Sequence, residues 1–129
     1  MKAKLSLADA FHIALGGTLG SLLRWWIGLG FAGTFPFPTL FANLLGSVAL
    51  GVLYAIQHRM HPHGKYLFMI GFCGSFTTVS SFFLETLELW QGGHQWLGLL
   101  NVSVSVAGAL LLVACVIPLV ERAERSPGR

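Results

Sequence analysis

Apolar residues in this sequence are gathered into four long blocks, which short polar stretches separate. The blocks run from about residue 8 to 33, from 39 to 56, from 66 to 90 and from 97 to 120. Each approaches or exceeds the ~20 apolar residues that an α-helix needs to cross a bilayer, and none alternates as a half-buried strand does. The pattern predicts an all-α membrane protein in which residues 1–129 form one domain of four transmembrane helices.

The third block differs from a plain lipid-facing helix, because small and hydroxylated residues occupy its centre. That centre reads GFCGSFTTVSSFFLE, from Gly71 to Glu85. Two interpretations fit this composition: either the small residues let neighbouring helices pack closely, or the helix is broken and its backbone lines a polar cavity. A break near Gly74 would free carbonyl groups that suit a hard cation such as Na⁺, and amide groups that suit a small anion.

The first block combines a packing motif with a single cation. The spacing Gly16-x-x-x-Gly20 places small residues on one face, where a neighbouring backbone can approach closely. Arg24 stands beside Trp25 and Trp26, past the middle of the helix. It is either an anchor at the membrane interface or a buried cation near a pore mouth, where it would attract an anion.

The remaining candidate side chains each allow a packing role and a pore role. Asn43 is either an interhelical hydrogen-bonding residue or a donor that lines a pore. Phe82 is either a packing residue or an aromatic edge that touches an anion, and Glu85 lies near the headgroups or in a pore vestibule. Asn101 and Ser105 are four residues apart in the fourth block, so they share one helix face.

Composition and charge narrow the class of protein. With 54% hydrophobic and 10% charged residues, the chain is typical of polytopic membrane proteins rather than nucleic-acid-binding ones. Of its eight Lys and Arg residues, all but Arg24 fall on one side of the four-helix topology, so the positive-inside rule places both termini in the cytoplasm. The sequence contains no Ser/His/Asp, HExxH or paired-carboxylate arrangement at a useful spacing, which favours transport over enzymatic catalysis.

Three segments together resemble a known family. They are GGTLGSLLRWW (Gly16 to Trp26), TLFANLLGSVALG (Thr39 to Gly51) and GFCGSFTTVSSFFLE (Gly71 to Glu85). These segments resemble the signature regions of the Fluc-type fluoride channels, small proteins of the bacterial inner membrane. The resemblance implies an antiparallel dimer of four-helix subunits, whose broken third helices cross around a central Na⁺. It also implies two narrow pores that pass fluoride out of the cytoplasm and exclude chloride.

The resemblance also implies roles for individual residues. The backbone carbonyls of Gly74 and Thr77 would bind the structural Na⁺. Asn43 would donate to fluoride in the pore, and Phe82 would match the second of two pore phenylalanines. The polar track would include Ser80, Ser81 and Ser105. Glu85 would be the carboxylate near the pore mouth, and Arg24 the basic residue of the first-helix motif.

Three features depart from the family pattern. Val79 stands where the first pore phenylalanine is usually found, and Asn101 stands where a tyrosine is common. The charge bias is also strong for a chain that inserts with dual topology to form an antiparallel homodimer. These departures favour, as an alternative, a non-conducting or half-pore subunit that pairs with a paralogous chain. A small four-helix multidrug exporter is a further alternative, but its first helix would need a carboxylate that residues 10–33 lack.

Overall fold

The structure is a computed structural model that describes residues 5–31 and 33–126, and every regular element in those ranges is helical. The long helices are α1 (Leu7–Leu29), α2 (Phe37–Ile56), α5 (Val79–Gln91) and α6 (Gln95–Arg125). Between α2 and α5 lie the short helices η1 (Gln57–Arg59), α3 (Pro62–Gly64), η2 (Lys65–Cys73) and α4 (Gly74–Phe76), of which η2 is a π-helix. The all-helical class predicted from the sequence is therefore confirmed for the described residues.

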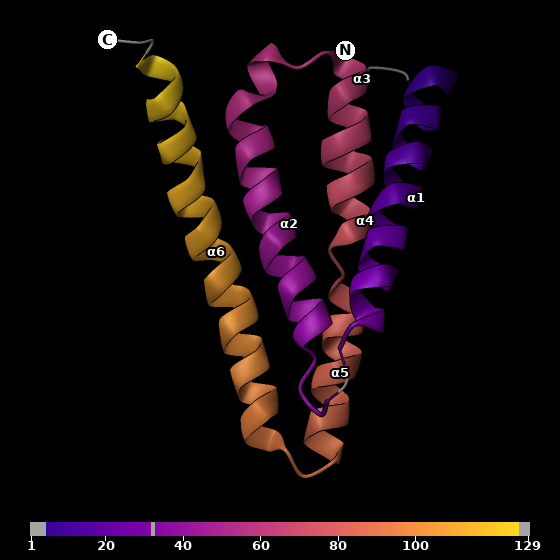
Figure 1. The fold of residues 1–129 in the computed structure, drawn as a ribbon, viewed down its shortest axis with the longest axis vertical. Coiled ribbons are helices and arrows are strands. Elements are labelled where there is room, and N and C mark those ends of the chain that lie inside the picture. The colour runs from indigo at the N-terminus through magenta and orange to yellow at the C-terminus, as the bar shows by residue number, and fades with distance from the viewer. Residues whose placement is uncertain (1–4, 32, 127–129) are drawn as a thin grey trace.

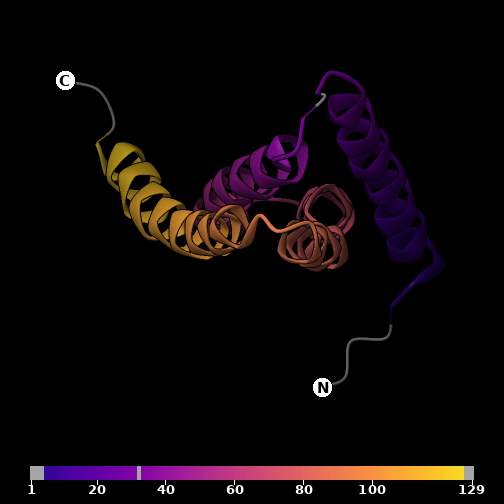
Figure 2. The same cartoon turned by 90° about the horizontal axis from the view of Figure 1, so that it is seen from below.

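The helices run up and down along the long axis of the molecule (Figure 1). α1 begins and α6 ends at the same end, and the segment from α3 to α5 forms the third pass through the bundle. α1 packs on η2 and α4, whereas α2 packs on α6 and α6 also contacts α5. Seen from below, the third pass lies between α1 on one side and α2 and α6 on the other (Figure 2).

Three helical stretches in the described part of the chain are long and apolar enough to cross a membrane. They are Phe37–Arg59, Pro62–Gln91 and Gln95–Arg125, with mean hydropathies of 1.8, 1.7 and 2.5. Many of their large apolar side chains point outward, as lipid-facing residues do. These features describe a multi-pass membrane protein.

α1 has 23 residues but is not among the three, because it contains Asp9, His12 and Arg24 besides its apolar residues. It ends at Leu29, before the predicted limit of residue 33, and residue 32 lies outside the described ranges.

Glycines bring α1 into direct backbone contact with the third pass. A methyl group added at Gly16 would overlap the carbonyl of Leu67, and one at Gly20 would overlap the carbonyl of Phe72. A Cβ at Gly71 would lie 2.5 Å from the carbonyl oxygen of Ile13. The Gly16-x-x-x-Gly20 spacing predicts such an approach, and the structure confirms it.

The third pass changes its backbone conformation between α4 and α5. Thr77 has φ −79° and ψ 155°, and Thr78 has φ −147° and ψ 125°, so both residues are extended. The amide and hydroxyl of Thr77 both donate to the carbonyl of Cys73, at 3.1 and 2.9 Å. α5 then begins at Val79, with Thr78 as its N-cap. Figure 1 shows this as a thin stretch of ribbon between the two helices.

The connection between α2 and the third pass is tied to helices on both sides. At the start of α1, Asp9 N donates to Ser6 Oγ and Ser6 N donates to Asp9 Oδ2, which forms a capping box. The other carboxylate oxygen of Asp9 lies 3.1 Å from Nδ1 of His63 in α3, where the connection enters the third pass. Arg59 in the same connection pairs with Glu124 of α6 at 3.2 Å.

With the exception of Arg24, which lies beside Trp25, the tryptophans and the described lysines and arginines lie at opposite ends of the molecule. α1 and α5 end, and α6 begins, at the lower end of Figure 1, and these segments hold Trp25, Trp26, Trp90 and Trp96. The opposite end holds Arg59, Lys65, Arg122 and Arg125. The other cations that the sequence count assigns there, Lys2, Lys4 and Arg129, lie outside the described residues. The positive-inside rule assigns such a cationic end to the cytoplasmic side, and tryptophans are typical of the membrane interface.

Candidate functional site

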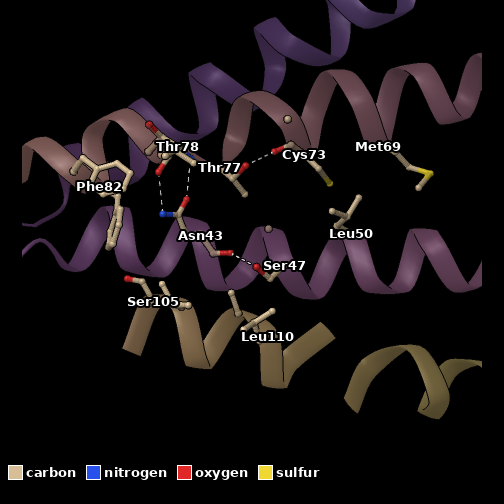
Figure 3. Close-up of a pocket in the computed structure, with 16 residues that line it drawn as sticks. Asn43, Ser47, Leu50, Met69, Cys73, Thr77, Thr78, Phe82, Ser105 and Leu110 are labelled. Carbon is tan, nitrogen blue, oxygen red and sulfur yellow. Dashed lines mark hydrogen bonds between the residues drawn. The ribbon is translucent and has the colours of Figure 1, made fainter. Parts of the chain in front are cut away.

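A cavity of about 560 Å³ lies beside the extended residues of the third pass (Figure 3). Its wall is built from α2, the third pass and α6. The predicted site residues that line it are Asn43, Gly74, Thr77, Val79, Phe82 and Ser105. Ser80, Ser81, Arg24 and Glu85 are not part of its wall. The structure therefore brings six predicted residues from three separate segments together around one cavity. The other four predicted residues lie outside its wall.

Asn43 of α2 holds the extended segment through a two-point contact. Its Nδ2 donates to the carbonyl of Thr78 at 3.0 Å, and the amide of Thr78 donates to its Oδ1 at 2.8 Å (Figure 3). The Oδ1 of Asn43 thus replaces the acceptor that a regular helix would give to the Thr78 amide, and its Nδ2 adds a donor to the Thr78 carbonyl. Of the two roles that the sequence allows for Asn43, the interhelical contact is present. The contact leaves one Nδ2 hydrogen of Asn43 for another acceptor.

The same contact changes the surroundings of Gly74. In a continuous α-helix the amide of Thr78 would donate to the carbonyl of Gly74, four residues earlier. Here that amide donates to Asn43, so the Gly74 carbonyl loses the partner that a continuous helix provides. A Cβ at Gly74 would meet no atom within 4 Å, which shows that this residue borders open space. A residue of the cavity wall therefore has a carbonyl group that lacks its helical partner.

Hydroxyl groups cluster at the N-terminus of α5. Thr78 Oγ1 accepts a hydrogen bond from the amide of Ser81 at 3.2 Å and caps the helix. The hydroxyl oxygens of Ser80 and Ser81 lie 3.3 and 3.2 Å from Thr78 Oγ1. The first amides of a helix carry partial positive charge, so this end of α5 favours an anion.

Two adjacent phenylalanines, the buried Phe82 and the exposed Phe83, form the aromatic part of the wall. Phe82 is 8% exposed, and its ring meets Phe83 edge-on at a centroid distance of 5.1 Å. Val79, one turn earlier, is 69% exposed at the rim of the cavity. The cavity therefore has an exposed valine at the position where the family pattern has its first pore phenylalanine.

A chain of hydrogen bonds behind the wall includes Thr86, a residue that the sequence analysis did not single out. Asn101 of α6 is 1% exposed, and its Nδ2 donates to Thr86 Oγ1 at 2.9 Å. Thr86 Oγ1 in turn donates to the carbonyl of Phe82 at 2.7 Å. Ser105 Oγ donates to Asn101 Oδ1 at 3.5 Å, the longest contact of the chain. Thr86 follows Phe82 by four residues, and this spacing was the only sequence signal for the contact.

Glu85 and Arg24 lie away from the main cavity. Glu85 Oε1 accepts a hydrogen bond from Thr39 Oγ1 at 2.6 Å, and its Oε2 is buried with no hydrogen-bond partner among the described residues. Glu85 lines a second cavity of about 450 Å³, which the α1–α2 loop and the end of α5 enclose. Arg24 Nε donates to the carbonyl of Ser75 at 3.3 Å, so it binds the end of the helix that precedes the extended residues.

Comparison of the sequence with known proteins identifies a family to which it is similar. The family described as "CrcB-like protein, Camphor Resistance (CrcB)" matches residues 11–117. A protein of Leptospira interrogans serogroup Icterohaemorrhagiae serovar Lai, named fluoride-specific ion channel FluC, is 45% identical over 105 residues, or 76% of this chain and 83% of that protein. Proteins of the same name from Saccharophagus degradans and Paramagnetospirillum magneticum are 37% and 44% identical, over 85% and 78% of this chain and 87% and 86% of their own lengths.

These matches extend over most of the chain and include all three segments that carry the resemblance to Fluc-type channels. The resemblance is therefore confirmed. The chain belongs to the CrcB-like family of membrane proteins, and the relatives named above are ion channels and not enzymes.

Proposed function

We propose that this chain is a subunit of a passive, fluoride-selective channel that carries fluoride out of the cytoplasm. The observation that carries the proposal is the pair of extended residues, Thr77 and Thr78, which Asn43 holds open beside a cavity. The names of the relatives supply the anion. Hydrogen fluoride enters cells as a neutral acid and dissociates in the neutral cytoplasm, so a passive route for the anion suffices for export.

The chemistry of the wall suits a small anion. The free Nδ2 hydrogen of Asn43 is a hydrogen-bond donor, and the N-terminus of α5 adds partial positive charge. The Ser105 hydroxyl donates to Asn101 in this structure and would have to turn from that 3.5 Å contact to donate to an anion. The edge of the Phe82 ring carries partial positive charge and binds an anion only weakly, which allows it to move on. In the proposed pore Ser80 and Ser81 continue the polar track, and Arg24 and Glu85 stand near its mouths. Donors fixed around a narrow path favour fluoride over the larger chloride.

A structural Na⁺ forms part of the proposal, and Gly74 and Thr77 are its proposed ligands. Two observations fit this ion: the Gly74 carbonyl has lost its helical partner, and Gly74 borders open space. Hard cations take about six oxygen ligands, so two carbonyls from one chain need matching carbonyls from a second copy. Na⁺ bound there would supply a fixed positive charge between two subunits.

The proposed assembly is an antiparallel dimer in the bacterial inner membrane. Each subunit contributes four transmembrane helices, with α1 as the first and the interrupted third pass at the dimer centre. The exposure of the cavity rim favours a second subunit beside the third pass, because the apolar side chains of Val79 and Phe83 are 69% and 63% exposed there. Close apposition of two third passes would cover them and enclose the cavity.

Fluoride efflux from liposomes that contain only this polypeptide tests the proposal. A fluoride electrode should record release of internal fluoride, and a chloride electrode should record little release under the same gradient. Empty liposomes are the control for leakage. Equal permeability to chloride, or the absence of flux from a preparation that is dimeric by size-exclusion chromatography, would refute a self-sufficient fluoride channel.

A second candidate is a half-pore subunit of a heterodimeric channel. Val79 in place of an aromatic residue and the separation of tryptophans from cations favour it, because a chain with such polarity inserts preferentially in one orientation. Reporter tags at the two ends distinguish the candidates: equal insertion in both orientations supports a homodimer, and a single orientation supports a partner chain.

A further inference from the structure

α5 is a short helix whose orientation does not follow from α4. It has 13 residues, and two extended residues separate it from the preceding helix. Extended residues transmit no helical hydrogen bonds, so the rotation of α5 about its own axis depends on contacts with α2 and α6. That rotation decides where Phe82 points, since the ring is carried by the first turn of α5.

Two buried amide contacts lie on either side of Phe82 along α5. Thr78, Phe82 and Thr86 are spaced four residues apart, so they lie along one face of the helix. Asn43 of α2 binds the backbone of Thr78, and Asn101 of α6 binds the hydroxyl of Thr86. Phe82 therefore lies between two residues, Thr78 and Thr86, that form hydrogen bonds with neighbouring helices.

We propose that Asn101 is a positioning residue for the pore phenylalanine, and that it acts on Phe82 through Thr86. The inference deepens the proposed function and rests on it for the role of Phe82. Asn101 does not line the cavity, whereas Phe82 and Ser105 do. Its effect on an ion would therefore be indirect. The shorter of its two contacts leads to the hydroxyl of Thr86, which connects the Asn101 amide to the carbonyl of Phe82, and the longer one leads to Ser105.

The hydrogen bonds between Asn101, Thr86 and Phe82 explain why an amide is needed at position 101. The Thr86 hydroxyl has one hydrogen, which it gives to the Phe82 carbonyl, so a partner from α6 must be a donor. Asn101 supplies that donor, and its Oδ1 accepts from Ser105. Leucine has a similar size but no donor, so it would leave the Thr86 oxygen without its α6 partner. The rotation of α5 would then depend on apolar packing alone.

Fluoride efflux from liposomes tests the route of this effect. Asn101→Leu and Thr86→Val should each lower efflux about fivefold or more, the ratio that corresponds to a loss of about 1 kcal/mol of positioning. The double variant should lose less than the two single losses combined, because both substitutions remove the contact between Asn101 and Thr86. Thr86→Ser keeps the hydroxyl and should retain wild-type efflux. Ser103→Ala, on an exposed position of the same helix, is the matched control.

The environment of the Phe82 ring can be measured independently of fluoride flux by ¹⁹F NMR. With 4-fluorophenylalanine in place of Phe82, the ¹⁹F NMR spectrum of the full chain in nanodiscs should show one narrow resonance. Asn101→Leu and Thr86→Val should shift or broaden this resonance in the same way, and Thr86→Ser and Ser103→Ala should leave it in place. An unmoved resonance in both Asn101→Leu and Thr86→Val overturns the inference, whatever happens to efflux.

The two measurements separate this inference from the proposed function. If the wild-type chain carries no fluoride, the proposed function fails and the resonance alone decides whether Asn101 positions the ring. If the resonance moves and efflux is unchanged, the positioning of Phe82 stands and its role in the pore fails. If Asn101→Leu does not fold, Thr86→Val and Thr86→Ser decide the question from the other side of the contact.

Discussion

Replacing Asn43 with alanine removes both hydrogen bonds that hold the extended segment to α2. The contact from the buried Thr78 amide would be lost without replacement, at a cost of about 1–3 kcal/mol, and the contact to the Thr78 carbonyl contributes about 0.5–1.5 kcal/mol. Together they amount to about 3 kcal/mol, which corresponds to about a hundredfold change in the population of the ordered segment. An amide that only joins two membrane helices contributes about 1 kcal/mol or less.

Two assays follow this variant. Fluoride efflux from Asn43→Ala liposomes should fall at least about tenfold, because the segment that lines the proposed pore loses its support. Size-exclusion chromatography in detergent should still show the wild-type oligomer, since Asn43 contributes little apolar surface. Ser47→Ala is the matched control, because Ser47 lies one turn further along α2, lines the same cavity and bonds only the carbonyl of Asn43.

Wild-type efflux in Asn43→Ala, together with an unchanged thermal unfolding midpoint, would show that the contact supports neither the segment nor the pore. A reduced midpoint with wild-type efflux would assign Asn43 to folding alone. An equal loss in Ser47→Ala would mean that the cavity wall is sensitive to any polar deletion, and the reasoning from the two-point contact would not hold.

Further variants address the other parts of the site. Phe82→Ile should lower fluoride efflux strongly while chloride efflux stays low, because isoleucine has no aromatic edge; unchanged fluoride efflux would return Phe82 to a packing role. Val79→Phe should raise fluoride efflux if the rim at this position belongs to a pore, and unchanged efflux would indicate that this side is silent. Gly16→Val should lower the thermal unfolding midpoint in detergent by several degrees, since its side chain would overlap the Leu67 carbonyl, whereas Gly28→Ala, which meets no atom within 4 Å, should change it little.

Much of the fold could be predicted from the sequence because its determinants are local. Apolar block length determines where membrane helices lie, and the Gly16-x-x-x-Gly20 spacing determines which face of α1 meets the third pass. The small and hydroxylated residues between Gly71 and Ser81 left two interpretations open, close helix packing or a break in the helix. In the structure Gly71 contacts the backbone of α1, and Thr77 and Thr78 are extended. The end of α1 was less predictable, because an apolar block continues past the residue at which hydrogen bonding stops.

The partners of the polar side chains could not be predicted, because they depend on contacts between distant segments. Asn43 and Thr78 are 35 residues apart, and Thr39 and Glu85 are 46 apart. Residue type shows that each needs a partner, but only the packing of α2 against α5 shows which atoms meet. Thr86 was missed for the same reason: a threonine in a membrane helix usually bonds its own backbone, and its second contact comes from α6.

The direct backbone contact between α1 and the third pass has a consequence for motion in this protein. Where main chains touch without side chains between them, neither helix can slide or tilt without a clash, so α1 and η2 move as one rigid body. α5 instead meets its neighbours through side chains with rotatable bonds. Within the third pass, the half that follows Thr78 is therefore freer to move while an ion passes than the half that packs on α1.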